Sequence, residues 1–294
     1  MNSESRRLLQ ETRFNRPGTF AELARQRQRR SSTSGSGQLL IVAADHPAKG
    51  AFRVGSNPDA MGNRYELLDR LVVALSSPFV DGVLATPDVV EDLLLLGVLE
   101  NKLVFGSMNR GGLPGASFEM DDRFTAYTPE SIIQFGLDGG KMLLRINLDD
   151  PGSVNTLAAC AGSVTALASA GRVAMLEPFM SKRVNGLSQN QLTTEDVIRS
   201  CAIASGLGST SAYSWLKIPI VDNMSQVAES VTLPLLLLGG DQSEQPDEMF
   251  QRWEDALQLP GVRGLAVGRN LLYPPDDDVA AAVKTAARLL REVI

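Results

Sequence analysis

Short apolar segments alternate with helical patterns along most of the chain. The apolar segments are near-continuous runs rather than strict alternations, which is typical of parallel strands that are buried on both faces. We predict eight such strands, at residues 38–44, 80–85, 101–106, 141–147, 173–177, 213–218, 233–239 and 262–267. Helical patterns fall between them, at residues 63–77, 87–98, 128–138, 152–170, 193–206, 222–231, 244–258 and 276–293.

Eight strand–helix units in a row favour one architecture. A span of about 250 residues holding eight βα units is typical of a TIM (β/α)8 barrel. The alternative, a doubly wound sheet, would place a G-x-G-x-x-G turn after its first strand, whereas the residues there are Ala43-Ala44-Asp45-His46-Pro47. We therefore predict an N-terminal helical arm with its linker at residues 1–37 and a barrel domain at residues 38–294.

Composition describes an ordinary globular protein. Hydrophobic residues make up 44% of the 294 positions, and no apolar run approaches the ~18–20 residues of a membrane span. The start of the chain is polar and arginine-rich, so we predict no secretory signal. Cys160 and Cys201 lie in helical patterns and are interpreted as reduced core thiols. Together these features predict a cytoplasmic protein without a membrane partner.

The histidine count limits the chemistry. The only histidine is His46, and a catalytic zinc site usually draws on several histidines or on histidine with cysteine or carboxylate ligands. A Ser-His-Asp arrangement would have to use His46, and no G-x-S-x-G elbow accompanies it. We therefore predict no metal and no cofactor, and favour chemistry carried out by lysine and carboxylate groups.

Charge is distributed unevenly. Residues 1–30 carry eight arginines against three glutamates, whereas the whole chain has a net charge of -6. A basic arm can bind nucleic acid, but this arm lacks interleaved aromatic residues, and we predict no nucleic-acid partner. Instead the arm is predicted to form one or two helices that pack on the barrel or on a neighbouring subunit of a homo-oligomer. A flexible Ser/Gly linker at residues 31–37 follows it.

Lys217 is the most informative single residue, because it lies within an apolar strand, Tyr213-Ser214-Trp215-Leu216-Lys217-Ile218. Burial disfavours the charged form of a lysine and shifts it toward the neutral amine. A neutral amine is the nucleophile that Schiff-base chemistry on a carbonyl substrate requires. The other interpretation is a structural ion pair between Lys217 and Glu177 inside the barrel.

Further polar residues stand where the strands of a barrel end, which is where the active sites of TIM barrels lie. Arg145 shares strand parity with Lys141, so an inward Lys141 implies an inward Arg145. An inward arginine favours a second anionic group on the substrate, although Arg145 and Glu177 could also pair as filling of the barrel. The set at the strand ends comprises Asp45, His46, Arg145, Asn147, Glu177 and Lys217.

In its order of motifs the chain resembles the class I aldolases of the DeoC/LacD group, which include the tagatose-1,6-bisphosphate aldolases and the archaeal-type fructose-bisphosphate aldolases. The resemblance covers roughly residues 38–292. It rests on Asp45 after strand one, Lys141 opening strand four, Leu176-Glu177-Pro178 on strand five, Lys217-Ile218-Pro219 on strand six, Gly239-Gly240 after strand seven, and Gly268-Arg269-Asn270 after strand eight.

The resemblance implies a role for each matching residue. Lys217 would form the Schiff base, Asp45 would act on substrate hydroxyls and the carbinolamine, and Glu177 would be a general acid and base. Lys141 would lower the pKa of Lys217 by like-charge repulsion. A phosphate would lie at a cradle formed by Gly239, Gly240, Gly268 and Arg269. His46 is a candidate substrate contact. A departure is Arg145-Ile146-Asn147, where those enzymes often have a tyrosine.

The function that the resemblance implies is a metal-independent class I aldolase. It would cleave a phosphorylated ketose or keto acid sugar to a dihydroxyacetone-phosphate-type product and an aldehyde, in sugar or inositol catabolism. The alternatives are a phosphosugar isomerase or epimerase on the same barrel, with Glu177 as base, and a non-catalytic phosphosugar-binding protein.

Overall fold

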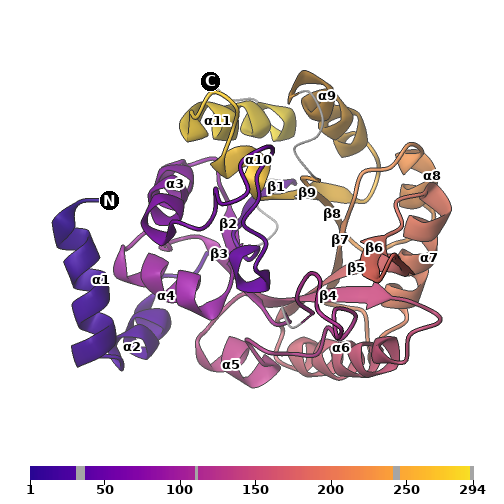
Figure 1. The fold of residues 1–294 in the computed structure, drawn as a ribbon, viewed down its shortest axis with the longest axis horizontal. Helices are drawn as coiled ribbons and strands as arrows, with labels where there is room; N and C mark the ends of the chain where they lie inside the picture. The colour runs from indigo at the N-terminus through magenta and orange to yellow at the C-terminus, as the bar shows by residue number, and fades with distance from the viewer. Residues whose placement is uncertain (31–36, 110–111, 241–245, 292–294) are drawn as a thin grey trace.

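Eight parallel strands close into a barrel in a computed structural model that describes residues 1–30, 37–109, 112–240 and 246–291 (Figure 1). Neighbouring strands follow the order β4-β3-β2-β1-β9-β8-β7-β5, and pairing of β4 with β5 closes the ring. The barrel strands are β1 (Leu39–Ala43), β2 (Gly82–Ala85), β3 (Leu103–Ser107), β4 (Gly139–Ile146), β5 (Val173–Val184), β7 (Ser214–Ile218), β8 (Leu235–Leu238) and β9 (Val262–Val267). The predicted TIM barrel is confirmed.

Helices surround this barrel and follow the strands in alternation (Figure 1). The ring consists of α3 (Arg64–Ser76), α4 (Pro87–Leu95), α5 (Pro129–Gln134), α6 (Gly152–Ser169), α7 (Thr194–Ser205), α8 (Met224–Glu229), α9 (Pro246–Leu257) and α11 (Val279–Leu290). Each overlaps one of the predicted helical segments. Two single-turn helices, η1 (Pro47–Lys49) and α10 (Arg269–Leu272), follow β1 and β9 and were not predicted.

Alternate residues of the strands build two separate cores. On β1, Leu39 and Ile41 join an inner cluster that fills the barrel together with Phe105 and Met175. The intervening residues Leu40 and Val42 pack outward among the helices in the larger cluster. Because both faces of each strand are buried, the strands read as continuous apolar runs in the sequence. The same alternation places a polar side chain inside the barrel wherever one replaces an inward apolar residue.

Strand β5 departs from the prediction. The predicted strand ended at residue 177, but β5 continues through Pro178 to Val184 and pairs antiparallel with β6 (Leu187–Asn190). Asn185 and Gly186 connect the two strands with positive φ angles of 52° and 82°, the conformation of a two-residue hairpin turn. Pro178 is accepted within the strand, and the resulting hairpin extends beyond the barrel.

The basic arm packs on the barrel rather than standing free. It forms α1 (Ser3–Asn15) and α2 (Thr19–Gln26), which lie outside the helical ring next to α4 (Figure 1). Arg13 donates to Asp92 of α4 at 2.7 Å, and Arg27 donates to Asp138 at 3.1 Å. One of the two predicted placements of the arm is thus observed. Of the predicted linker, residues 31–36 lie outside the described residues.

Cys160 and Cys201 are free and buried, which agrees with their interpretation as core thiols. Within the described ranges, no helix is long and apolar enough to cross a membrane. The cytoplasmic location and the homo-oligomer stay predictions.

Candidate active site

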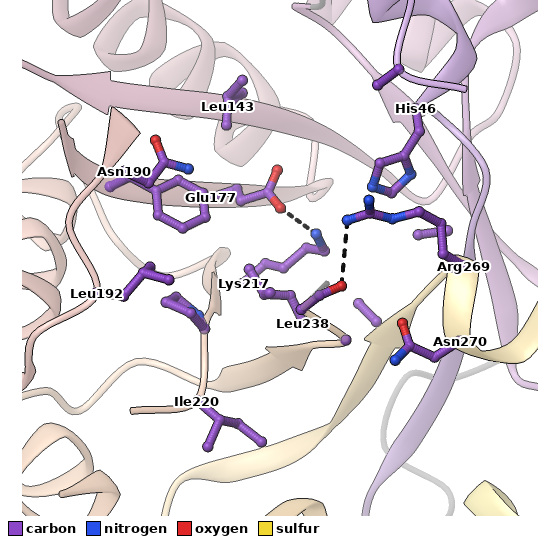
Figure 2. A pocket seen from close by; sticks show the side chains of 18 of the residues that line it. His46, Leu143, Glu177, Asn190, Leu192, Lys217, Ile220, Leu238, Arg269 and Asn270 are labelled. Carbon is purple, nitrogen blue, oxygen red and sulfur yellow. Dashed lines mark hydrogen bonds and ion pairs between the residues drawn. The ribbon is translucent and has the colours of Figure 1, made fainter. Parts of the chain in front are cut away.

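A cavity of about 790 Å³ opens at the carboxyl ends of the strands, within the size range of small-molecule sites. Of the predicted site residues, Glu177 and Lys217 line it together with His46, Arg145 and the glycine turns. Figure 2 shows Lys217 in the middle of this space with Glu177 on one side and Arg269 on another. The strand ends thus bring together residues that lie more than 200 positions apart in the chain.

Four charged side chains form a continuous chain of contacts around Lys217. The Lys217 ammonium contacts one carboxylate oxygen of Glu177, and the Lys141 ammonium contacts the other. Lys141 also lies 3.3 Å from Oδ2 of Asp45, which accepts a further hydrogen bond of 3.0 Å from the Ser107 hydroxyl. All four charged residues are at least 90% buried. Two positive and two negative charges balance, which is what makes their burial tolerable.

The lysines differ in their access to the cavity. Lys217 lines the cavity, whereas Lys141 is 0% exposed and is absent from its described lining. Asp45 is 2% exposed and is also absent from that lining; its carboxylate lies 3.8 Å from His46 and 3.3 Å from Lys141. A substrate in the cavity can therefore contact Lys217 and Glu177 directly. Lys141 and Asp45 contact these two residues or each other without lining the cavity.

Burial and neighbouring charges shift Lys217 toward the neutral amine. Burial lowers the pKa of Lys217, the attraction of Glu177 opposes this shift, and repulsion by Lys141 adds to it, with a net pKa below the ordinary value for lysine. For Glu177, burial alone would raise the pKa, but the two ammonium groups outweigh it and lower the pKa to about 2. Glu177 is therefore an ionised carboxylate at neutral pH, in direct contact with the Lys217 nitrogen.

The glycine turns after β8 and β9 form another part of the cavity wall. Gly240 has a φ of +69°, which favours glycine, and its carbonyl accepts a 3.4 Å hydrogen bond from the Arg269 guanidinium. A Cβ on Gly239 would lie 2.6 Å from Val267, and one on Gly268 would collide with the Ala43 carbonyl. Packing alone therefore accounts for Gly239 and Gly268. Gly239, Gly240, Gly268 and Arg269 all line the cavity, and their role as a phosphate cradle stays a prediction.

Arg145 lies inward, as the strand parity predicted, but its partners are different from those expected. Its guanidinium donates two 2.6 Å hydrogen bonds to the Asp122 carboxylate, and it also contacts the backbone of Glu119. It does not fill the barrel by pairing with Glu177, whose carboxylate is held by the lysines. Asp122, 0% exposed, already neutralises Arg145. Direct contact of Arg145 with a substrate anion stays a prediction that this geometry does not favour.

Several lining residues were not anticipated. Lys49 lines the cavity and lies 3.9 Å from Asp122, whereas Ser188 and Asn190 come from the β5–β6 hairpin. The sequence holds one signal for this hairpin, the Asn185-Gly186 pair between two candidate strands.

The predicted strand-end residue Asn147 is not among the described lining residues of the cavity, and its backbone N–H donates to Ser153 at 2.9 Å. In the described parts of the chain, no three His, Cys, Asp or Glu side chains gather as a metal ion would need.

Fold and site together define a (β/α)8 barrel with a buried lysine–carboxylate centre at the carboxyl ends of its strands. Residues 37–287 match the family model described as Cgl0159-like, and the chain belongs to this family. The crystal structure of Cgl0159 from Corynebacterium glutamicum has 56% sequence identity and a TM-score of 0.95, over 99% of this chain and 98% of that one. No curated protein matches the sequence.

Solved aldolases share the fold at low identity. A Schiff-base-forming fructose-1,6-bisphosphate aldolase is 18% identical with a TM-score of 0.61, over 92% of this chain and 100% of that one. A fructose-bisphosphate aldolase from Slackia heliotrinireducens is 15% identical with a TM-score of 0.65, over 96% and 84%. These likenesses support the barrel. Membership of the DeoC/LacD group is not confirmed by them.

Proposed function

We propose that the protein is a class I aldolase that cleaves a phosphorylated ketose or keto acid sugar. The observation that carries the proposal is Lys217, a buried amine that lines a cavity in contact with Glu177 and has a lowered pKa. A neutral, accessible amine beside a carboxylate is the arrangement that imine formation needs. The fold shared with Schiff-base-forming aldolases supports the same chemistry.

The chemistry proceeds in four steps. Neutral Nζ of Lys217 attacks the ketone carbon, and the carbinolamine takes up one proton from solvent through Glu177, loses water and becomes a protonated imine. Glu177 then accepts the proton of the hydroxyl next to the scissile bond. That bond breaks, its electrons pass to the imine to form an enamine, and an aldehyde leaves. Protonation of the enamine and hydrolysis of the imine release the ketone product and free Lys217.

The remaining site residues assist these reaction steps by balancing charge, positioning side chains and binding the phosphate. Lys141 keeps the charge around Glu177 balanced and disfavours protonation of Lys217. Asp45 holds Lys141 and is itself held by Ser107. The turn at Gly239 and Gly240 with Arg269 offers backbone N–H groups and one guanidinium to the substrate phosphate.

Reductive trapping tests the proposal. Wild-type protein treated with sodium borohydride in the presence of dihydroxyacetone phosphate should gain one substrate-sized adduct by intact mass spectrometry, and Lys217→Ala should gain none. Lys182→Ala, which removes an exposed lysine of β5, is the matched control and should trap as wild type does. No adduct with this or any other keto phosphate would exclude the aldolase and leave two alternatives, the phosphosugar isomerase or epimerase and the non-catalytic phosphosugar-binding protein.

A further inference from the structure

The β5–β6 hairpin supplies one wall of the cavity. Ser188 and Asn190 of β6 line the cavity, whereas Gln189 between them belongs to the other face of the strand. This alternation means that two polar side chains of the hairpin are presented to whatever occupies the site. Neither has a part in the lysine–carboxylate chemistry.

Asn190 is held in one orientation. The hydroxyl of Ser181, its cross-strand partner, donates to Oδ1 of Asn190 at 3.0 Å, and Ser181 is 3% exposed. This leaves Nδ2 as the pocket-facing donor, and Figure 2 shows the amide nitrogen turned toward the side on which Glu177 lies. Among the described residues, Nδ2 makes no hydrogen bond within the protein. A fixed donor facing a cavity is a feature of a binding site.

The hairpin is anchored to the loop between β3 and α5. Its Ser188 backbone N–H donates to Glu119 at 3.3 Å, and its Ser188 hydroxyl donates to the sulfur of Met120 at 2.8 Å. Arg183 donates to Asp150 at 3.1 Å on the other side of the turn. The wall that carries Asn190 is therefore in place before any substrate binds.

Position and charge indicate which part of the substrate meets this wall. In Figure 2, Asn190 and Arg269 lie on opposite sides of Lys217, so a substrate with its phosphate at Arg269 extends past Lys217 toward Asn190. Three cations lie next to this wall: Arg145 and Lys49 face Asp122, and Arg183 of the hairpin pairs with Asp150. With Glu119 included, their charges sum to zero. This corner of the cavity suits a neutral oxygen better than a second anion.

We propose that Asn190 donates through Nδ2 to a hydroxyl oxygen on the aldehyde half of the substrate. The substrate class is then a ketose monophosphate with a neutral, hydroxylated far half. This inference rests on the proposed aldolase function. Ser181 is a positioning residue that orients the Asn190 amide.

Condensation kinetics test it. With dihydroxyacetone phosphate as donor, kcat/KM would be measured for D-glyceraldehyde, for propanal, which lacks the hydroxyls, and for glyoxylate, which is anionic. Wild-type enzyme should prefer glyceraldehyde to propanal by at least about tenfold, and Asn190→Ala should lose most of that preference. Ser181→Ala should lose a smaller part, and Gln189→Ala, the neighbour on the other face, should keep the wild-type ratio.

The outcomes separate this inference from the aldolase proposal itself. A wild-type protein without a borohydride adduct refutes the proposed function. An adduct in both wild type and Asn190→Ala, with the same preference among aldehydes, overturns only the role of Asn190. A wild-type enzyme that prefers glyoxylate, or that traps the donor but condenses with no hydroxyaldehyde, also overturns it.

Discussion

Lys141 and Lys217 lie close together in space but differ in their access to the cavity. Both are buried and both contact the Glu177 carboxylate, but only Lys217 lines the cavity. Access therefore favours Lys217 over Lys141 as the nucleophile of the proposed reaction. The Lys141 ammonium balances the charge of Glu177, so the carboxylate can stay ionised even when Lys217 is neutral.

Two substitutions should shift the pH dependence of Lys217 in opposite directions. Lys217 attacks as the neutral amine, so adduct formation falls as pH drops through its pKa. Lys141→Met removes a repulsive charge, raises the pKa of Lys217 and moves the acidic limb to higher pH. Glu177→Gln removes an attractive charge, lowers that pKa and moves the limb to lower pH. Initial rates of borohydride trapping across pH measure both.

Glu177→Gln also tests whether Glu177 acts as the general acid and base, apart from its effect on the pKa of Lys217. Cleavage by Glu177→Gln should fall by about 100-fold or more, because a general acid–base group is lost. Trapping by Lys182→Ala should keep the wild-type pH profile. If the acidic limbs of the pH profiles of Lys141→Met and Glu177→Gln moved in the same direction, the proposed effect of these charges on Lys217 would be refuted.

At the scale of elements, the apolar runs were enough to predict the eight barrel strands, because burial on both faces leaves little room for polar residues. The hairpin was missed for a physical reason. Pro178 reads as a strand end, since proline cannot donate a ladder hydrogen bond, but β5 retains it opposite Leu144. The Asn185-Gly186 turn was the better signal.

Side-chain pairing was harder to predict than strand position. The inward placement of Arg145 follows from strand parity, but its partner Asp122 lies in an irregular loop without hydrophobic periodicity. No spacing rule connects a strand residue to such a loop. Glu177 and Lys217 could thus be predicted to face the cavity because barrel strands fix them. Lys49 of η1 and Asn190 of β6 were missed because the elements that carry them were not predicted.

The Arg145–Asp122 pair should be important for stability. Arg145→Met leaves the 0% exposed Asp122 carboxylate without its bidentate partner, and the free energy of unfolding should fall by about 3–5 kcal/mol. Equilibrium urea denaturation measures the loss. Arg123→Ala is the matched control, because Arg123 is an exposed arginine of the same loop that pairs with its near neighbour Asp121, and it should leave stability nearly unchanged. Equal stability of Arg145→Met and wild type would refute the anchoring role.

At the scale of the whole molecule, the positive charge of the arm is paired with negative charge on the barrel. The arginines at the end of the basic arm meet carboxylates that precede the strands, Arg27 and Arg29 at Asp138 and Arg30 at Asp81. These contacts lie at the amino ends of the strands, opposite the cavity. One end of the barrel thus carries the candidate active site, and the arm packs on the other end, a division typical of this fold.

Substitution of Arg27 should therefore affect stability without affecting the chemistry. Its guanidinium side chain, 1% exposed, joins Asp138 to the carbonyls of Lys102 and Gly136, so it links the starts of β3 and β4 to the arm. Arg27→Ala should lower the free energy of unfolding by about 3 kcal/mol in urea titrations. Arg7→Ala, at an arm arginine whose side chain is 74% exposed, should not. Both variants should trap dihydroxyacetone phosphate as wild type does at 25 °C. A loss of trapping in folded Arg27→Ala would instead couple the arm to the active site across the barrel.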